Sequence, residues 1–208
     1  METYDVATTK ADLYQSSTSI VLMAGIYEGA IRVGAVHKHG DLGLGTCEHL
    51  DGEMVIVDGR CYQVRCDGVV TACDDDVLSP LAVITRFASD ETVAFDKCAD
   101  MAHLTSRIDT LRTSDTALFA LRVDGWFEYV HTRAMCVTPH GVQPEFKLHN
   151  VYGTLVGFWT PRYATTLNVP GYHLHFMSDD RESGGHLQQC RGRNLRLQIQ
   201  RTCCVNGP

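Results

Sequence analysis

Three Asp-Gly pairs, each set between short runs of β-forming residues, constrain the fold of this chain more than any other feature. The pairs lie at 58–59, 67–68 and 124–125. An Asp-Gly pair suits the centre of a tight type I′ turn, because both positions require a positive φ. Each pair therefore predicts a β-hairpin, and several hairpins favour antiparallel sheets over a doubly wound parallel sheet.

The predicted strands are short runs rich in aliphatic and aromatic residues. In chain order they cover residues 54–57, 61–64, 118–123, 126–130, 154–159, 172–176 and 195–199. The first two strands are expected to pair across the 58–59 turn, and the third and fourth across the 124–125 turn.

Helical periodicity occurs in two segments. A Ser/Thr cluster at 16–19 offers caps for a helix over 20–27, and a second helical pattern runs over 104–111. The sequence therefore predicts an α+β fold made of two mixed or antiparallel β-sheet halves with few helices. The polar stretch over 96–115 indicates a boundary between these halves.

The expected domains follow from that boundary. They are an N-terminal tail over 1–13, a sheet-plus-helix domain over 14–112 and a β-rich, metal-binding domain over 113–208.

The charge balance argues against two classes of partner. With 18 Lys and Arg residues against 25 Asp and Glu residues, the net charge of −7 provides no basic surface for nucleic acids or anionic membranes. The longest apolar run, 20–27, is far shorter than the ~20 residues that span a bilayer. The acidic N-terminus is unlike a secretory signal. We therefore expect a cytoplasmic protein with neither a nucleic-acid nor a membrane partner.

Nine cysteines are present, but their spacing does not suit a metal site. No Cys-x-x-Cys pair occurs, and Cys61, Cys66 and Cys73 lack the spacing of a zinc knuckle. Cys203 and Cys204 are too close together to chelate one metal well. We therefore expect reduced, mostly structural thiols, as in cytosolic proteins.

Three of the ten histidines form a pattern that suits a metal site. The period of two in a strand places His173 and His175 on one face and Leu174 on the other, in a core. A Ser-Gly-Gly turn at 183–185 precedes His186, and a tight return of the chain would bring His186 beside the pair. Three neutral imidazoles suffice to bind zinc with one position left open.

A purely structural interpretation stays open, in which His173 and His175 hydrogen-bond inside the sheet and His186 lies on a loop. The remaining seven histidines are interpreted as surface or packing residues. They are His37, His39, His49, His103, His131, His140 and His149.

An open metal site also needs a proton carrier and a cation for an anionic substrate. Glu53 opens an apolar strand, where partial desolvation would raise its pKa towards neutral pH. Arg133 ends a predicted hairpin strand and could hold a carboxylate through two hydrogen bonds. Both residues are also compatible with solvated charges at strand ends.

Several motifs, in the same order along the chain, resemble the α-acetolactate decarboxylase family. They cover residues 40–46, 50–55, 122–125, 132–133, 157–161, 168–176 and 178–186. The resemblance as a whole runs from Tyr14 to Leu187, and its strongest part is Asn-Val-Pro-Gly-Tyr-His-Leu-His-Phe at 168–176.

The resemblance implies a two-domain α/β protein with one metal ion, normally zinc, held by the three histidines His173, His175 and His186. Members of the family convert 2-acetolactate to acetoin and carbon dioxide. Glu53 and Arg133 match the family's site glutamate and arginine, and Thr46 matches a threonine near the substrate.

The expected chemistry suits these parts. The hydroxyl and ketone oxygens of acetolactate can chelate zinc, and loss of carbon dioxide leaves an enediolate whose charge a dication stabilises. Arg133 would orient the carboxylate, and Glu53 would deliver a proton to one face to give chiral acetoin. The expected partner is therefore a small keto-acid substrate, and no organic cofactor is required.

The chain departs from the family pattern in two places. The loop between Arg133 and the motif at 143–146 is short, and a glutamate that family members carry in a C-terminal tail has no counterpart after Glu182. One alternative is a member repurposed for another β-keto or α-hydroxy-keto acid in a biosynthetic pathway. Another is a non-catalytic, zinc-stabilised binding module. Hydrophobic hairpin edges are also compatible with a homodimer.

Overall fold

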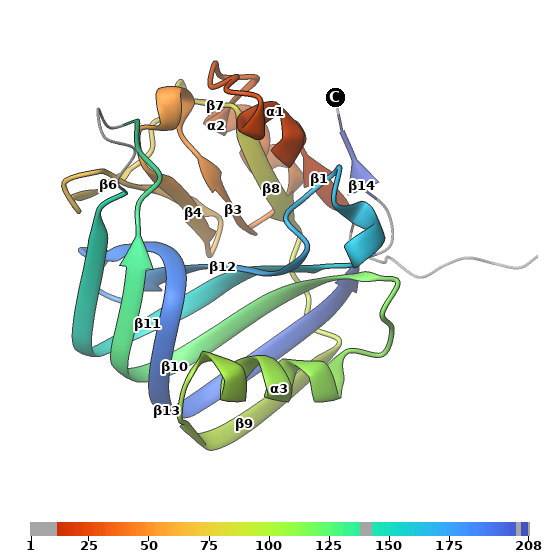
Figure 1. The fold of residues 1–208 in the computed structure, drawn as a ribbon, viewed down its shortest axis with the longest axis vertical. Coiled ribbons are helices and arrows are strands. Elements are labelled where there is room, and N and C mark those ends of the chain that lie inside the picture. The colour runs from red at the N-terminus through yellow and green to blue at the C-terminus, as the bar shows by residue number, and fades with distance from the viewer. Residues whose placement is uncertain (1–11, 138–142, 203–204, 208) are drawn as a thin grey trace, which may run out of the picture.

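Two β-sheets packed face to face make up most of the molecule. The computed structural model describes residues 12–137, 143–202 and 205–207. In Figure 1 the first sheet lies above the second, with short helices over the first sheet and helix α3 (Met101–Leu111) against β9 and β13 of the second. The predicted α+β class is confirmed, because the described residues form mostly strands with few helices.

The first sheet has seven strands in the order β14-β1-β8-β3-β4-β5-β6. They are β1 (Leu13–Gln15), β3 (Leu42–Thr46), β4 (Glu53–Val57), β5 (Arg60–Val64), β6 (Val70–Ala72), β8 (Leu81–Thr85) and β14 (Val205–Asn206). All neighbours are antiparallel except β14 and β1, which are parallel. Short elements accompany this sheet: α1 (Ser19–Met23), β2 (Ile31–Arg32), α2 (Val33–Val36), η1 (His37–His39), η2 (Glu48–Leu50) and β7 (Leu78–Ser79).

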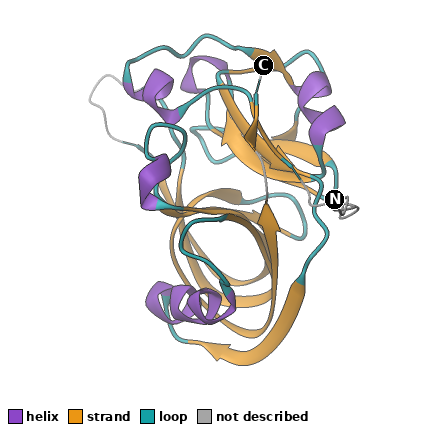
Figure 2. Ribbon diagram, turned by 90° about the vertical axis from the view of Figure 1, so that its right-hand side faces the viewer, coloured by secondary structure: helices purple, strands orange, loops and turns teal. Residues whose placement is uncertain are grey.

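The second sheet closes on itself. It contains β9 (Glu91–Cys98), β10 (Leu118–Arg133), β11 (Glu145–Thr160), β12 (Gly171–Ser178) and β13 (Gly184–Thr202), with the 3₁₀ turn η3 (Arg162–Ala164) after β11. Strand β10 pairs with both β11 and β13, so β10 to β13 form a ring, and β9 pairs with β13. Figure 2 shows this ring in the lower part of the molecule.

Alternation along β12 sorts its side chains between two cores. Leu174 and Phe176 point into the core of the ring, as predicted for Leu174, whereas Met177 packs in the core between the two sheets. Because neighbouring residues of a strand face opposite ways, His173 and His175 share the face of Met177 and point towards the first sheet.

Alternation along β4 has the same effect in the first sheet. Val55 and Val57 pack in the core between the sheets, whereas Met54 and Ile56 pack in a third core on the outer face. Glu53 shares the face of Val55 and therefore points towards the second sheet. The inner faces of β4 and β12 thus bring a carboxylate and two imidazoles into one layer.

Two of the three predicted hairpins are confirmed. Strands β4 and β5 are joined at Asp58 and Gly59, whose φ angles are 53° and 72°, and β5 and β6 are joined around 67–68. The second predicted helix is confirmed as α3, which is capped by the Asp100 carboxylate. The first is shorter than expected, because α1 covers only Ser19–Met23 and has no side-chain cap.

The hairpin predicted at 124–125 is wrong. Strand β10 runs straight through this pair, where Asp124 lies opposite Thr154 and Gly125 opposite Gly153 of β11. The φ of 153° at Gly125 coincides instead with a register shift against β13, which is a β-bulge. Pairing with a long strand on each side overrides the local turn preference of Asp-Gly.

The two halves of the chain are not divided evenly between the sheets. Strand β9 and helix α3 precede the boundary expected at 112/113, yet both lie with the second sheet, and the domain division stays a prediction.

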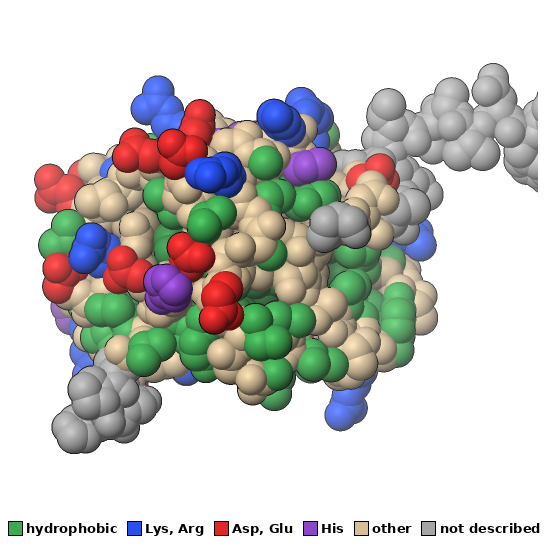
Figure 3. Space-filling view, turned by 90° about the horizontal axis from the view of Figure 1, so that it is seen from above, with side chains coloured by type: hydrophobic (Ala, Val, Ile, Leu, Met, Phe, Trp, Pro, Cys, Tyr) green, Lys and Arg blue, Asp and Glu red, His purple; other side chains and the backbone are tan. Residues whose placement is uncertain are grey.

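Across the described ranges, no helix has the length and apolar character needed to cross a membrane. The face above the first sheet carries scattered Lys and Arg side chains with acidic ones between them (Figure 3).

Gly157 of β11 provides a test of how tightly the strand carrying His173 is packed. A Cβ at Gly157 would overlap the carbonyl oxygen of His173. We expect Gly157→Ala to lower the free energy of unfolding by ~1–3 kcal/mol, because β11 and β12 must move apart. Urea unfolding followed by circular dichroism measures the change.

The matched control is Gly207→Ala, whose Cβ would lie 3.4 Å from its nearest neighbour, the Gln15 carbonyl oxygen. Equal unfolding midpoints for the two variants would contradict the prediction.

Candidate metal centre

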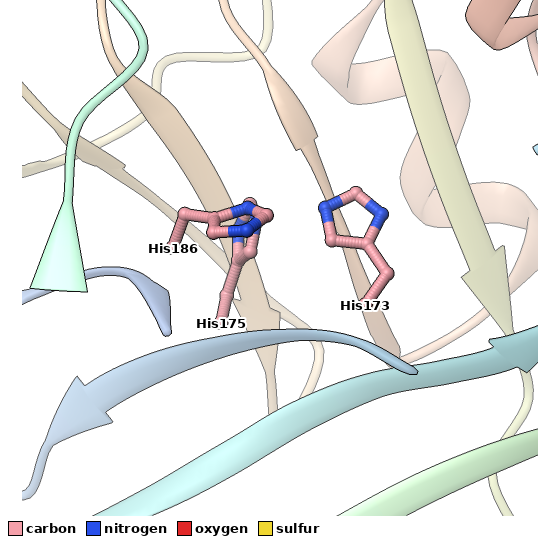
Figure 4. Close-up of side chains that lie close together, drawn as sticks. All are labelled: His173, His175 and His186. Carbon is pink, nitrogen blue, oxygen red and sulfur yellow. The ribbon is translucent and has the colours of Figure 1, made fainter. Parts of the chain in front are cut away.

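The β12–β13 hairpin brings together the three histidines predicted from the sequence. His175 of β12 lies directly opposite His186 of β13, and His173 lies two residues before His175 on the same face. Figure 4 shows the three imidazoles pointing towards a common centre. The tight return of the chain therefore has the effect that the sequence predicts, but the turn lies at 179–183, and Gly184 and Gly185 are already part of β13.

The geometry of the three imidazoles suits one metal ion. Their ring centroids are 5.0 to 5.3 Å apart, and one nitrogen atom of each ring lies within 4.8 Å of the other two. Nε2 of His175 is buried and has no hydrogen-bond partner among the described residues. Buried polar atoms are rarely left unpaired, and a cation held between the three rings would satisfy this nitrogen.

A backbone carbonyl sets the orientation of His175. Its Nδ1–H donates to the carbonyl oxygen of Met54 at 2.8 Å, across the gap between the two sheets. The proton therefore resides on Nδ1, which leaves the lone pair of Nε2 free to bind a metal.

The imidazoles are held in the neutral form that metals require. Burial lowers the pKa of His173 to about 4, with the positive charge of Arg133 acting in the same direction. Burial also lowers the pKa of His186 to about 3, and that of His175 well below its usual range. All three rings therefore present lone pairs at neutral pH.

Glu53 lies beside the imidazoles in a buried position. Its Oε2 is 3.5 Å from Nε2 of His175, and its Oε1 accepts the backbone N–H of Met135 at 2.9 Å. Burial raises the pKa of Glu53 to about 8, against the lowering effects of the Met135 N–H and the Arg133 charge. The carboxyl group can therefore both hold and release a proton near neutral pH.

Arg133 extends the same row of side chains. It is the last residue of β10 and lies directly opposite His186 of β13. Its Nε is buried and has no hydrogen-bond partner among the described residues. A guanidinium with an unused, buried donor is suited to an anionic ligand.

Thr46 lies next to Glu53 in the first sheet. The two residues are directly opposite each other in the β3–β4 pair, so their side chains share a face. The Thr46 hydroxyl is buried and donates to the carbonyl oxygen of Gly52 at 2.7 Å. Its oxygen therefore remains available as an acceptor.

A disulfide holds the segment that contacts Glu53. Cys136, next to Met135, is bonded to Cys66 in the turn between β5 and β6. The carbonyl oxygen of Met135 also accepts the N–H of Gly52 at 3.1 Å. The expectation of reduced thiols is therefore wrong for Cys66 and Cys136, because the fold brings together two cysteines that are 70 residues apart.

The structure thus places all six predicted site residues in one region, while their roles stay predictions. Sequence reasoning missed the Met54 carbonyl and the Met135 N–H, because a backbone group leaves no mark on residue type. It also missed the disulfide, whose spacing matches no motif. His140 lies outside the described residues.

Comparisons with known sequences agree on one family. The sequence pattern of alpha-acetolactate decarboxylase matches residues 13–206. An alpha-acetolactate decarboxylase of Methanosarcina mazei is 38% identical over 193 residues, which are 88% of this chain and 67% of that protein. One from Bacillus subtilis is 37% identical over 186 residues, which are 85% of this chain and 73% of that protein.

Comparisons with solved structures give the same result. A crystal structure of alpha-acetolactate decarboxylase from Bacillus subtilis matches 95% of this chain and 88% of that chain, with a TM-score of 0.90 and 34% identity. A Staphylococcus aureus protein of unknown function, described as similar to alpha-acetolactate decarboxylase, has a TM-score of 0.89 and 28% identity over 94% of this chain and 88% of that chain.

The three-histidine site predicts a specific loss of metal binding. We expect His173→Ala to weaken Zn²⁺ binding by more than the ~10–100-fold that follows loss of a residue that only hydrogen-bonds to a ligand, because a direct ligand is removed. Competition with a chromophoric chelator measures the affinity. His149→Ala, at an exposed position of β11, is the control and should bind Zn²⁺ like the unmodified protein. Unchanged binding in His173→Ala would exclude this site.

Proposed function

The chain belongs to the alpha-acetolactate decarboxylase family, and on that premise we propose that it converts 2-acetolactate to acetoin and carbon dioxide at a bound zinc ion. One observation carries the proposal: the three imidazoles place one nitrogen each within 4.8 Å of the other two, beside a buried carboxyl group and the guanidinium of Arg133. Relatives of this chain that match most of its length are named for this reaction.

The donor set favours zinc as the metal. Three neutral imidazoles are a common zinc ligand set, and hard cations such as Mg²⁺ prefer oxygen ligands. His173, His175 and His186 would hold the ion and leave a position open for substrate. When bound, zinc supplies a Lewis acid that polarises the ketone and hydroxyl oxygens of the substrate.

Arg133 is proposed to bind the substrate carboxylate. The reaction breaks the bond between this carboxylate and its neighbouring carbon, so the carboxylate must be held out of the plane of the ketone. Arg133 of β10 lies opposite His186 of β13, and its Nε has no hydrogen-bond partner among the described residues. A guanidinium can grip two carboxylate oxygens at once and so fix this angle.

Glu53 is proposed to supply the proton that replaces carbon dioxide. Its raised pKa keeps a proton on the carboxyl group near neutral pH, and the Met135 N–H holds Oε1 in place. Delivery from one fixed carboxyl reaches one face of the substrate, which would give chiral acetoin. Thr46, an acceptor beside Glu53, can receive the substrate hydroxyl.

A second candidate function is the decarboxylation of another β-keto or α-hydroxy-keto acid. The observation that favours it concerns the carboxylates of the chain. No acidic residue follows Glu182, which is exposed. Strand β14 pairs with β1 at the edge of the first sheet, with β1, β8 and β3 between it and the strand of Glu53. Among the described residues, Glu53 is the carboxyl group in contact with the imidazoles, and a site with one such acid would suit a different keto acid.

The decisive experiment is the release of acetoin from racemic 2-acetolactate. We expect rapid release by the protein as purified with zinc, loss of activity after chelation and recovery on addition of Zn²⁺. No acetoin from a protein that holds one zinc ion per chain would overturn the proposal and turn the search to other keto acids. Acetoin release that chelation leaves unchanged would overturn the role of the metal.

Substitution of Glu53 separates proton transfer from metal binding. We expect Glu53→Gln to retain zinc but to lower kcat by ~10²–10⁴-fold, because the amide cannot donate the required proton. Zinc content and acetoin release are measured on the same sample. Glu91→Gln, at an exposed position of β9, is the matched control. A fully active Glu53→Gln would remove Glu53 as the proton carrier.

A further inference from the structure

A second group of reactive side chains lies on the outer face of the first sheet. Cys47, Cys61 and Cys73 come from three separate segments and pack in or against the outer core. The side chains of Glu53 and Thr46 point to the opposite face of the same sheet. These thiols are therefore separate from the candidate metal centre.

Cys61 and Cys73 are arranged for a bond between them. The register of β5 and β6 pairs Tyr62 with Ala72, so Cys61 lies opposite Cys73 just beyond them. The N–H of Cys73 donates to the carbonyl oxygen of Cys61 at 2.9 Å, which continues the ladder. Directly opposed residues have Cα atoms ~4.5–5.5 Å apart, within the range of ~4.4–6.8 Å found in disulfides.

The two sulfur atoms are already in close contact. Sγ of Cys61 and Sγ of Cys73 are 3.0 Å apart, which is closer than the ~3.5–4.0 Å between non-bonded carbon atoms. No backbone movement is needed to bring them into line. Cys47 is the third member of the group and also hydrogen-bonds to Cys73.

The three thiols are not equivalent. Cys47 and Cys61 are buried, whereas Cys73 is half-buried and is the member of the group that solvent can reach. The thiols of Cys47 and Cys61 donate hydrogen bonds to Cys73, which lowers the pKa of Cys73 to about 4, whereas the pKa of Cys61 is raised. A solvent-accessible thiolate next to a buried thiol is the arrangement of a nucleophile and its resolving partner.

We propose that Cys61 and Cys73 form a redox site that small-molecule disulfides oxidise to an intramolecular disulfide. The thiolate of Cys73 attacks one sulfur of the small disulfide, whose S–S bond breaks and releases one thiolate. Cys61 then gives its proton to solvent and attacks Cys73, which releases the second thiolate. The two cysteines lose two electrons in total, and the small disulfide gains them.

The charge around Cys73 indicates which disulfides react best. Three consecutive aspartates at 74–76 are exposed directly after it. Anionic disulfides would be repelled there, and cationic ones attracted. Cystamine, which carries two ammonium groups, is therefore the appropriate probe.

The test is oxidation of the folded protein with cystamine, followed by alkylation of free thiols, trypsin digestion and mass spectrometry without reduction. Cys61 lies in the tryptic peptide 61–65, whereas Cys66 and Cys73 share the peptide 66–86 and Cys136 lies in 134–147. Before oxidation we expect 66–86 joined to 134–147 alone. After oxidation we expect all three peptides joined.

Two sets of variants assign the bond. In the double variant Cys66→Ser, Cys136→Ser the peptide 61–65 should still join 66–86, now through Cys73 alone. In Cys73→Ser the peptide 61–65 should remain fully alkylated. A link from 61–65 in Cys73→Ser, or a link from 39–60, which holds Cys47, in place of 61–65, would overturn the assignment.

The chain also supplies an internal control. Cys98 and Cys190 hydrogen-bond to each other in the core of the ring, where both are buried. Their peptides, 98–107 and 182–191, should stay alkylated because cystamine cannot reach them in the folded protein. Equal oxidation of both pairs would show unfolding rather than a site. If Cys47, Cys61 and Cys73 resist cystamine until a chelator is added, the three thiols bind a metal ion. That result would overturn the proposal.

Discussion

The hydrogen bond from Nδ1 of His175 to the carbonyl oxygen of Met54 is the interaction on which the arrangement of the site depends. It crosses the gap between the two sheets and is fully buried, so it fixes β12 against β4 at one point. It also turns Nε2 of His175 towards the metal position. Glu53 is the residue next to Met54 on β4, so the same contact places the carboxyl group 3.5 Å from that nitrogen.

The part of this arrangement that could be predicted depends on short-range periodicity. The alternation of a strand determines that His173 and His175 face one way and Leu174 the other, and a short turn after β12 limits where His186 can return. The presence of Glu53 beside them could be predicted only through the family resemblance, because its strand belongs to the other sheet. The backbone groups that orient these side chains could not be predicted at all, since any residue supplies an N–H and a carbonyl.

The errors share the same cause, which is contact between distant segments. The Asp-Gly pair at 124–125 has the composition of a turn, but β11 and β13 pair with β10 on both sides and leave only a bulge. The disulfide between Cys66 and Cys136 depends on the way the β5–β6 turn meets the end of β10. The spacing of residues along the chain does not predict that these two distant segments are in contact. Local motifs therefore predicted correctly where the chain reverses direction at the Asp-Gly pair, as at 58–59, and failed at 124–125, where β11 pairs with β10 on both sides of the Asp-Gly pair.

The same alternation that makes the histidines predictable keeps two kinds of chemistry apart within one sheet. Thr46 faces the candidate metal centre and Cys47 the outer core, and on β4 Glu53 and Met54 divide in the same way. Only the thickness of the backbone separates the two faces. A disulfide between Cys61 and Cys73 would link β5 to the end of β6. Glu53 is held by the β3–β4 ladder and by Met135. Strand β5 is in contact with both sets of residues, because its Cys61 and Val64 lie opposite Ile56 and Glu53 of β4, so the β4–β5 ladder is the physical link between the thiols and the acid.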